Sequence, residues 1–166
     1  MSGVPSPTNS AVFIVHGHGE TATLQLKKLL SDLGLNPIVL KDQDDHGMTI
    51  IEKFEYYALT CSFAFVLMTP DDQTVGLSGT KSLWRARQNV IMELGWFMAH
   101  LGRNRVVILY YGKLEIPSDI LGVVYSEFKT SVIEAADRIE LALKRVKLVD
   151  GNPSVFDQPA SPQLSD

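Results

Sequence analysis

"SFAFVLM", residues 62–68, is an apolar run with the length of a β-strand. A strand with one face in water would alternate polar and apolar residues, and this run does not alternate. A continuous apolar run of this kind is typical of a central strand in a parallel sheet, which helices cover on both faces. The run therefore favours an α/β fold built around a buried parallel sheet.

Strand-like and helix-like segments alternate on both sides of this run. The other predicted strands are "AVFIVHG" (11–17), "LNPIVL" (35–40), "RVVILYY" (105–111) and the end of "DILGVVYSEF" (119–128). The predicted helices span 20–33, 49–60, 83–101 and 131–147, with Thr49 as an N-cap, Gly34 and Gly102 as stops, and a long loop over 69–82. Right-handed crossovers then predict a flavodoxin-like sheet of five parallel strands in the order 2-1-3-4-5.

Composition indicates one soluble domain. A chain of 166 residues forms a core that buries roughly 70% of the unfolded surface. Both ends are rich in Pro, Ser, Gly and Asp, so we expect a disordered N-terminus (1–10), a domain (11–148) and a flexible tail or linker (149–166). No apolar run reaches the roughly 18 residues of a membrane span, and no signal-peptide pattern opens the chain. With a single cysteine, Cys61, these features predict a cytoplasmic protein without a membrane partner.

Net charge gives no reason to expect nucleic-acid binding, since the chain carries −4 at pH 7. In open parallel sheets, ligands lie beyond the carboxyl ends of the strands. The loop "HGHGETA" (16–22) follows the first strand there, and Gly17, Gly19 and Ala22 fit the pattern G-x-G-x-x-A. The glycines let a ligand approach the backbone, and the next helix offers free N–H groups to a phosphate. A turn that only needs flexible glycines explains the pattern equally well.

Two histidines alternate in this loop, so either His16 or His18 can face a ligand. No carboxylates or cysteines accompany them at metal-ligand spacing, which favours contact with a phosphate or hydroxyl over a metal. The loop 41–48 contains Asp44, Asp45, His46 and Gly47, and it is either a solvated connection or a protein-contact loop.

Further polar residues follow at the same edge. Asp71 lies in a turn that Pro70 favours, where it is free to cap or to bind. Arg87 and Asn89 come at the start of the third predicted helix. Arg87 is either a solvated charge or a partner for phosphate.

One carboxylate, Glu93, lies inside the otherwise apolar helix segment "NVIMELGWFMAH" (89–100). A helical wheel places Ile91, Leu94, Gly95 and Met98 on one side and Asn89, Glu93, Trp96 and His100 on the other. Glu93 is thus not forced into the core. Its aromatic neighbours Trp96 and Phe97 suggest a pocket wall, while an ordinary surface Glu beside an exposed Trp is the alternative.

Four segments together resemble a known family. "FIVHGHGE", "FVLMTPDD", "RQNVIMELGWFMAHLGRNRVVIL" and "IPSDILGV" are similar to the TIR-like, predicted nucleotide-binding domains of bacterial antiphage effectors, which occur fused to cyclic-nucleotide sensor domains. The resemblance covers about 11–147. It implies cleavage of NAD at the nicotinamide–ribose bond, with Glu93 at the position of the catalytic Glu. It also implies self-association through the loop 41–48, which matches the family's BB loop. "HGHGE" departs from the family's Ser-rich loop, and Met92 stands where Phe is usual.

A lone carboxylate suits this chemistry. An ordinary glycoside needs a second acid to protonate its leaving oxygen, whereas the cationic nicotinamide ring leaves NAD neutral and without a proton. We therefore predict an NAD+ nucleosidase that forms nicotinamide and ADP-ribose, or a cyclic variant, and is activated by self-assembly. NAD is its substrate, and no cofactor or metal is expected. The predicted substrate-binding residues are His16, Gly17, His18, Gly19, Asp71, Arg87, Asn89 and Trp96, and the predicted assembly loop holds Asp44, Asp45, His46 and Gly47.

Two alternatives remain from the sequence. A non-enzymatic TIR adaptor would act through TIR–TIR assembly alone, and a fused or separate sensor domain is a further expected partner in either case. A Rossmann-type dehydrogenase would use Gly17, Gly19 and Asp42 as its dinucleotide fingerprint. The predicted strands leave no second domain for the substrate of such a dehydrogenase.

Overall fold

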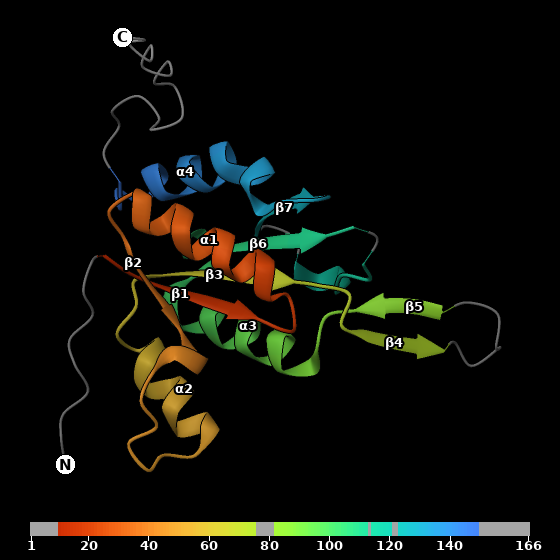
Figure 1. The fold of residues 1–166 in the computed structure, drawn as a ribbon, viewed down its shortest axis with the longest axis horizontal. Coiled ribbons are helices and arrows are strands. Elements are labelled where there is room, and N and C mark those ends of the chain that lie inside the picture. The colour runs from red at the N-terminus through yellow and green to blue at the C-terminus, as the bar shows by residue number, and fades with distance from the viewer. Residues whose placement is uncertain (1–9, 76–81, 113, 121–122, 150–166) are drawn as a thin grey trace, which may run out of the picture.

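The computed structural model describes residues 10–75, 82–112, 114–120 and 123–149. Its main sheet is parallel and has the order β2-β1-β3-β6-β7 (Figure 1). The strands are β1 (Ala11–His16), β2 (Asn36–Val39), β3 (Phe63–Met68), β6 (Val106–Tyr111) and β7 (Val124–Phe128). Taken in chain order, these five strands have the predicted order 2-1-3-4-5, so the flavodoxin-like α/β fold is confirmed.

Helices cover both faces of the sheet (Figure 1). On one side lie α1 (Glu20–Asp32) and α4 (Ala136–Arg145), and on the other lie α2 (Ile50–Ala58) and α3 (Gln88–Leu101). Strand β3 is buried along its whole length because Phe63, Phe65 and Leu67 pack into the first layer while Val66 and Met68 pack into the second. The continuous apolar run predicted this two-sided burial.

Local signals set the ends of several helices. The predicted N-cap Thr49 is confirmed, since Thr49 and Glu52 form a capping box at the start of α2. Gly34 and Gly102, at φ +78° and +81°, follow α1 and α3 in the left-handed backbone region that glycine adopts without strain. The segment predicted as one helix over 131–147 instead begins with a 3-10 helix, Val132–Ala135, before α4.

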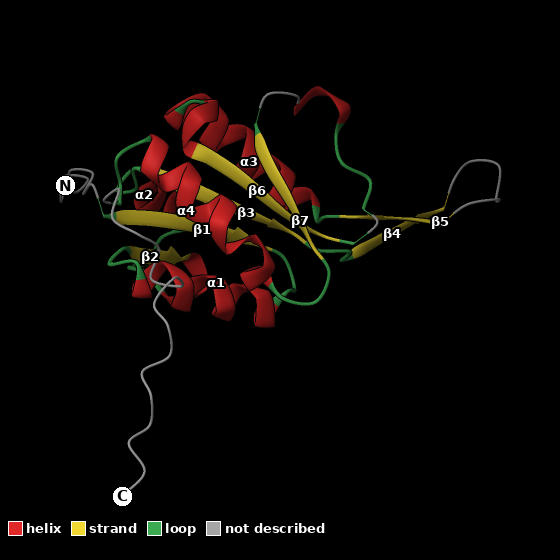
Figure 2. Cartoon of the chain, turned by 90° about the horizontal axis from the view of Figure 1, so that it is seen from above, coloured by secondary structure: helices red, strands yellow, loops and turns green. Residues whose placement is uncertain are grey.

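The connection from β3 to α3 differs from the prediction. The expected loop 69–82 and the first residues of the expected helix 83–101 contain an antiparallel hairpin of β4 (Asp72–Val75) and β5 (Ser82–Arg85). The hairpin projects from the end of the sheet (Figure 2). Helix α3 starts only at Gln88. The apolar Leu83 and Trp84 suggested an early helical stripe, but both side chains are exposed on the hairpin.

The predicted loose ends, 1–10 and 149–166, lie outside the described residues except for Ser10 and Val149. Among the described residues, no helix combines the length and apolarity that a membrane crossing needs.

Candidate active site

Helix α3 places Glu93 at the border between core and surface. The buried stripe of α3 consists of Val90, Leu94 and Phe97, spaced four and three residues apart. The predicted wheel was therefore rotated, since Gly95, which it placed on the inner side, is exposed. The true stripe lies beside Glu93, which makes Glu93 half-buried and closer to the core than the sequence indicated.

Glu93 faces a cavity of about 270 Å³. Strand β1, the segment after β2, and helices α2 and α3 all contribute to its wall. The lining residues are Ile14, His16, Leu40, Lys41, Asp45, Ile50, Lys53 and Glu93. Residues that lie far apart in sequence thus surround one carboxylate at the end of β1.

Burial raises the pKa of Glu93 from its ordinary value of 4.5 to about 7. Within the part of the chain that the structure describes, the Glu93 carboxylate makes no hydrogen bond or ion pair that offsets this desolvation. A carboxylate in that condition interacts strongly with any positive charge that enters the cavity, because few dipoles compete for it.

His16 lines the same cavity from the end of β1. Its Nδ1 donates to the carbonyl oxygen of Gly17 at 2.7 Å, and burial is the main cause that lowers the pKa of His16 below its usual value. The ring is therefore neutral at pH 7, and Nε2 keeps its lone pair. His16 can accept a hydrogen bond from a hydroxyl group or a water molecule.

Two lysines complete the polar wall. Lys53 on α2 is buried, with 7% of its surface exposed, and its Nζ lies 2.5 Å from Oδ1 of Asp45. Lys41 pairs with Glu20 of α1 at 3.2 Å. Sequence reading missed both lysines. The available signal for Lys53 was its place directly before the buried Phe54, on the apolar stripe of α2.

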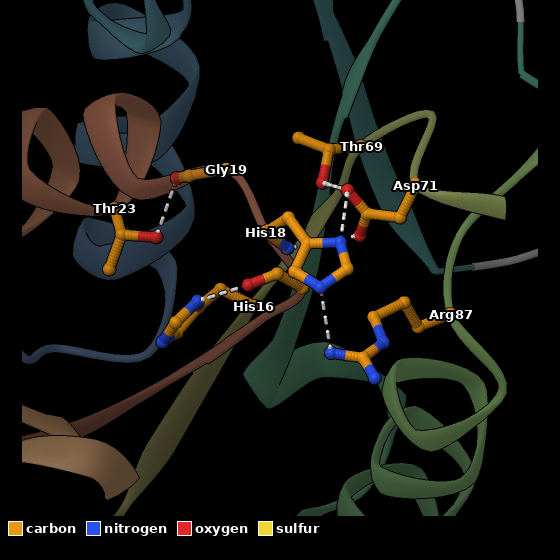
Figure 3. A network of polar contacts seen from close by, with 8 residues as sticks. His16, His18, Gly19, Thr23, Thr69, Asp71 and Arg87 are labelled. Carbon is orange, nitrogen blue, oxygen red and sulfur yellow. Dashed lines mark hydrogen bonds and ion pairs between the residues drawn. The ribbon is translucent and has the colours of Figure 1, made fainter.

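A second polar cluster lies on the other side of the loop after β1 (Figure 3). Asp71 accepts a hydrogen bond from the backbone N–H of His18 at 3.2 Å and another from the hydroxyl of Thr69 at 2.9 Å. Arg87 lies 3.2 Å from Nε2 of His18. Because a guanidinium only donates, this His18 nitrogen is the acceptor in the contact.

The same cluster explains the glycines of "HGHGE". A Cβ atom on Gly17 would lie 1.7 Å from Oδ2 of Asp71, and one on Gly19 would lie 2.7 Å from Cγ2 of Thr69. Side chains of the segment after β3 therefore pack directly against both glycines, while His18, Gly19, Thr69 and Asp71 also line a cavity of about 490 Å³. Close packing within the protein accounts for these two glycines.

Other predicted site residues are spread around the two clusters. Trp96 is half-buried and packs edge-on against Phe54, with ring centroids 5.2 Å apart, and its ring lies tilted against that of His100, with centroids 4.7 Å apart. Asn89 is exposed on the first turn of α3. The predicted assembly residues are exposed in the loop before α2, and the loop turns through left-handed backbone at His46 and Gly47.

Larger hollows exist elsewhere. One of about 590 Å³ lies between β5, the start of α3 and residues 115–118, next to an ion pair of Arg85 and Glu115 at 2.5 Å. Another of about 490 Å³ lies at the start of α1. The described residues contain no group of three or more His, Cys, Asp or Glu that could hold a metal ion. Of these hollows, the one at Glu93 combines a desolvated carboxylate with a buried cation, so we identify it as the candidate active site.

Comparisons with known proteins cover this region of the fold. The model of the CAP12/Pycsar effector protein TIR domain matches residues 11–130. An uncharacterized protein, YuaY, of Escherichia coli (strain K12) is 47% identical over 121 residues, which is 73% of this chain and 40% of the relative. Protein tirC of Dictyostelium discoideum is 34% identical over 138 residues, which is 77% of this chain and 69% of the relative.

A shorter match is the Pycsar effector protein PaPycTIR of Pseudomonas aeruginosa, 36% identical over 75 residues, or 44% of this chain and 24% of that protein. The chain thus spans less than half the length of the bacterial relatives YuaY and PaPycTIR. The family match extends from β1 to the residues just after β7, and it includes every residue that lines the Glu93 cavity. The resemblance to TIR-like domains is confirmed, and the chain belongs to the TIR-domain family of the CAP12/Pycsar effector proteins.

Proposed function

We propose that this domain is an NAD+ nucleosidase that acts as a TIR effector in bacterial defence against phage, with Glu93 as its catalytic residue. The observation that carries the proposal is a desolvated carboxylate, with a pKa of about 7, inside a cavity at the carboxyl end of β1. In sheets of this topology, ligands bind at that end. Membership of the family supports the same reading, since Glu93 stands where the resemblance implies the catalytic Glu.

The chemistry needs one carboxylate. The bond between C1′ of the ribose and the nicotinamide nitrogen breaks, and its electron pair neutralises the cationic ring. Positive charge then develops on the ribose, where an ionised Glu93 stabilises it. A water molecule adds to C1′ and releases one proton, and the neutral His16, which lines the same cavity, is our candidate to accept this proton at Nε2. The products are nicotinamide and ADP-ribose.

Cavity size indicates which part of NAD enters. A volume of about 270 Å³ lies just below the roughly 300–1,000 Å³ of pockets for drug-sized ligands. This volume suits a nicotinamide ring with its ribose better than a whole dinucleotide. We infer that the nicotinamide riboside half occupies the cavity and that the remaining half extends along the protein surface.

Self-association is the proposed switch. Ile50 is 80% exposed, Ile51 is exposed beside it, and both follow the predicted assembly loop directly. Ile50 also lines the Glu93 cavity. An apolar side chain at the mouth of a site, next to an exposed loop, favours a contact with a second copy that closes over the substrate.

Nicotinamide release tests the enzymatic proposal. Purified protein is incubated with NAD, with and without a crowding agent, and nicotinamide is followed by chromatography. We expect Glu93→Gln and Glu93→Ala to lower the rate by about 10²–10³, the usual effect of removing one preorganised charge-stabilising group. Glu55→Gln, which removes an exposed carboxylate of α2, is the matched control and should keep the wild-type rate. Cleavage that survives both Glu93 substitutions would contradict the assignment.

The second candidate function is a non-enzymatic TIR adaptor, and the exposed Ile50 and Ile51 also favour it. Light scattering measured on the same samples separates the two. Assembly without nicotinamide release, under every condition that assembles the protein, would favour the adaptor.

A further inference from the structure

Lys53 is a buried lysine that forms an ion pair with Asp45 of a surface loop. It lies on α2 and lines the Glu93 cavity, and its partner Asp45 comes from the loop before α2. The Asp45 side chain is 79% exposed, and the Lys53 hydrogen bond holds the pKa of Asp45 below its usual range. The cation is therefore fixed in the protein interior, while the anion belongs to the surface.

Lys41 and Asp42, at the start of this loop, pair with Glu20 and Lys27 of α1, but among the described residues few contacts hold 44–47 in place. The Tyr57 hydroxyl donates to the backbone oxygen of Asp44 at 3.3 Å, and the Met48 N–H donates to the backbone oxygen of Asp45 at 2.8 Å. The Asp45–Lys53 pair is the ionic link between the loop and the cavity. A loop with such contacts can leave at small cost, because its backbone groups can exchange to water.

Lys53 cannot follow the loop out. A buried ammonium group without a partner is strongly unfavourable, so a new anion must replace Asp45 if the loop moves. NAD carries two phosphates, and its pyrophosphate adjoins the nicotinamide riboside half that we place in this cavity. The cavity thus has a buried cation, Lys53, and the desolvated carboxylate of Glu93 in one wall.

We propose that Lys53 binds a phosphate group of the dinucleotide and that Asp45 occupies this phosphate position in the free chain. The inference rests on the proposed function, because it takes the substrate and its orientation from it. Loop 44–47 then links assembly to catalysis. Any contact that draws Asp45 away empties the phosphate position, and bound substrate in turn releases the loop for assembly.

The test measures binding of ADP-ribose by calorimetry. Asp45→Asn should bind ADP-ribose about tenfold more tightly than wild type, because the competing anion is gone. Lys53→Met keeps the side-chain length without the charge and should bind at least tenfold more weakly, whereas Lys53→Arg should stay within about threefold. Glu55→Gln removes an exposed charge from α2, the helix that carries Lys53, without touching the ion pair, and should not change the affinity.

Adenosine is the probe without phosphate, and its binding should not depend on Lys53. Three results would overturn the inference. Lys53→Met could bind ADP-ribose with wild-type affinity, Asp45→Asn could bind it no more tightly than wild type, or neither wild type nor Asp45→Asn could bind it. Circular dichroism and thermal unfolding confirm that each variant is folded, and Lys53→Arg keeps the question decidable if Lys53→Met unfolds.

The two proposals can fail separately. If the wild-type protein releases no nicotinamide but its ADP-ribose binding still depends on Lys53, the cleavage proposal is wrong and the phosphate site remains supported. If cleavage depends on Glu93 but ADP-ribose binding does not depend on Lys53, the cleavage proposal is supported and the phosphate site is wrong.

Discussion

Asp71 and Glu93 are two carboxylates near the end of β1, but they have opposite surroundings. Asp71 is 5% exposed at its side chain and accepts hydrogen bonds from His18 and Thr69. Glu93 borders a cavity, and burial raises its pKa to about 7. The first carboxylate is held by hydrogen bonds of the fold, and the second bears a desolvation cost that the fold does not offset. Stability experiments should therefore separate a structural carboxylate from a catalytic one before any substrate is added.

The largest expected effect is that of Asp71→Ala. This substitution leaves the buried Thr69 hydroxyl and the His18 N–H without their acceptor, and each hydrogen bond to a charged group contributes roughly 1.5–3 kcal/mol. We expect a loss of about 3 kcal/mol in the free energy of unfolding, or about 6–12 °C in Tm for a domain of this size. Asp72→Ala, the exposed neighbour on β4, should stay within about 0.5 kcal/mol. If Asp71→Ala loses no more unfolding free energy than about 0.5 kcal/mol, as expected for Asp72→Ala, then the hydrogen bonds of Asp71 do not stabilise the fold.

Glu93→Gln should have the opposite sign and depend on pH. The folded state binds the Glu93 proton more tightly than the unfolded state, so wild-type stability falls as pH rises from 4.5 towards 7. A pKa unit is worth about 1.4 kcal/mol, and partial exposure reduces the full shift to roughly 2 kcal/mol at pH 8. We expect Glu93→Gln to be more stable than wild type by that amount at pH 8 and by less than about 0.5 kcal/mol near pH 4.5.

Urea unfolding at both pH values measures this difference, and Glu55→Gln serves again as the exposed control. A Glu93→Gln variant that is less stable than wild type at pH 8 would mean that Glu93 has a stabilising partner. Glu93 would then resemble Asp71, as a carboxylate that interactions within the fold stabilise.

The order of the strands and the importance of Glu93 were predicted from the sequence on different grounds. Strand order followed from uninterrupted apolar strands, such as 62–68, and from the handedness of crossovers. The position of Glu93 followed from the resemblance of its segment to a family. Helical periodicity alone placed Glu93 too far from the core, because it could not tell whether Ile91 or Val90 leads the buried stripe.

The contacts of the loop after β1 depend on residues that are distant in sequence. Gly17 packs against Asp71, and His18 contacts Arg87, across separations that no local pattern records. The hairpin β4–β5 was missed because its apolar residues are exposed and look like the start of a helix. Lys53 was missed because a buried lysine is rare, and its counter-charge comes from Asp45 in the loop before α2. Tertiary packing decides the first of these cases, and the exposure of apolar residues or the burial of a charged one decides the other two.

Arg87 contributes little to the stability of the fold, although it contacts the Asp71 cluster. It belongs to the Asp71 cluster, yet it contacts a ring nitrogen of His18 rather than a carboxylate and its side chain is exposed, so its charge remains available to an anion. Arg87→Ala should change the free energy of unfolding by about 0.5 kcal/mol or less, as is usual for exposed polar contacts. If Arg87 also binds a substrate phosphate, as its position at the sheet edge predicts, the KM for NAD should rise about fivefold with kcat unchanged, because uniform binding is lost. Unchanged KM would leave Arg87 as a surface contact of His18, and a fall in kcat instead would place the guanidinium at the reacting ribose, in the chemistry we assign to Glu93.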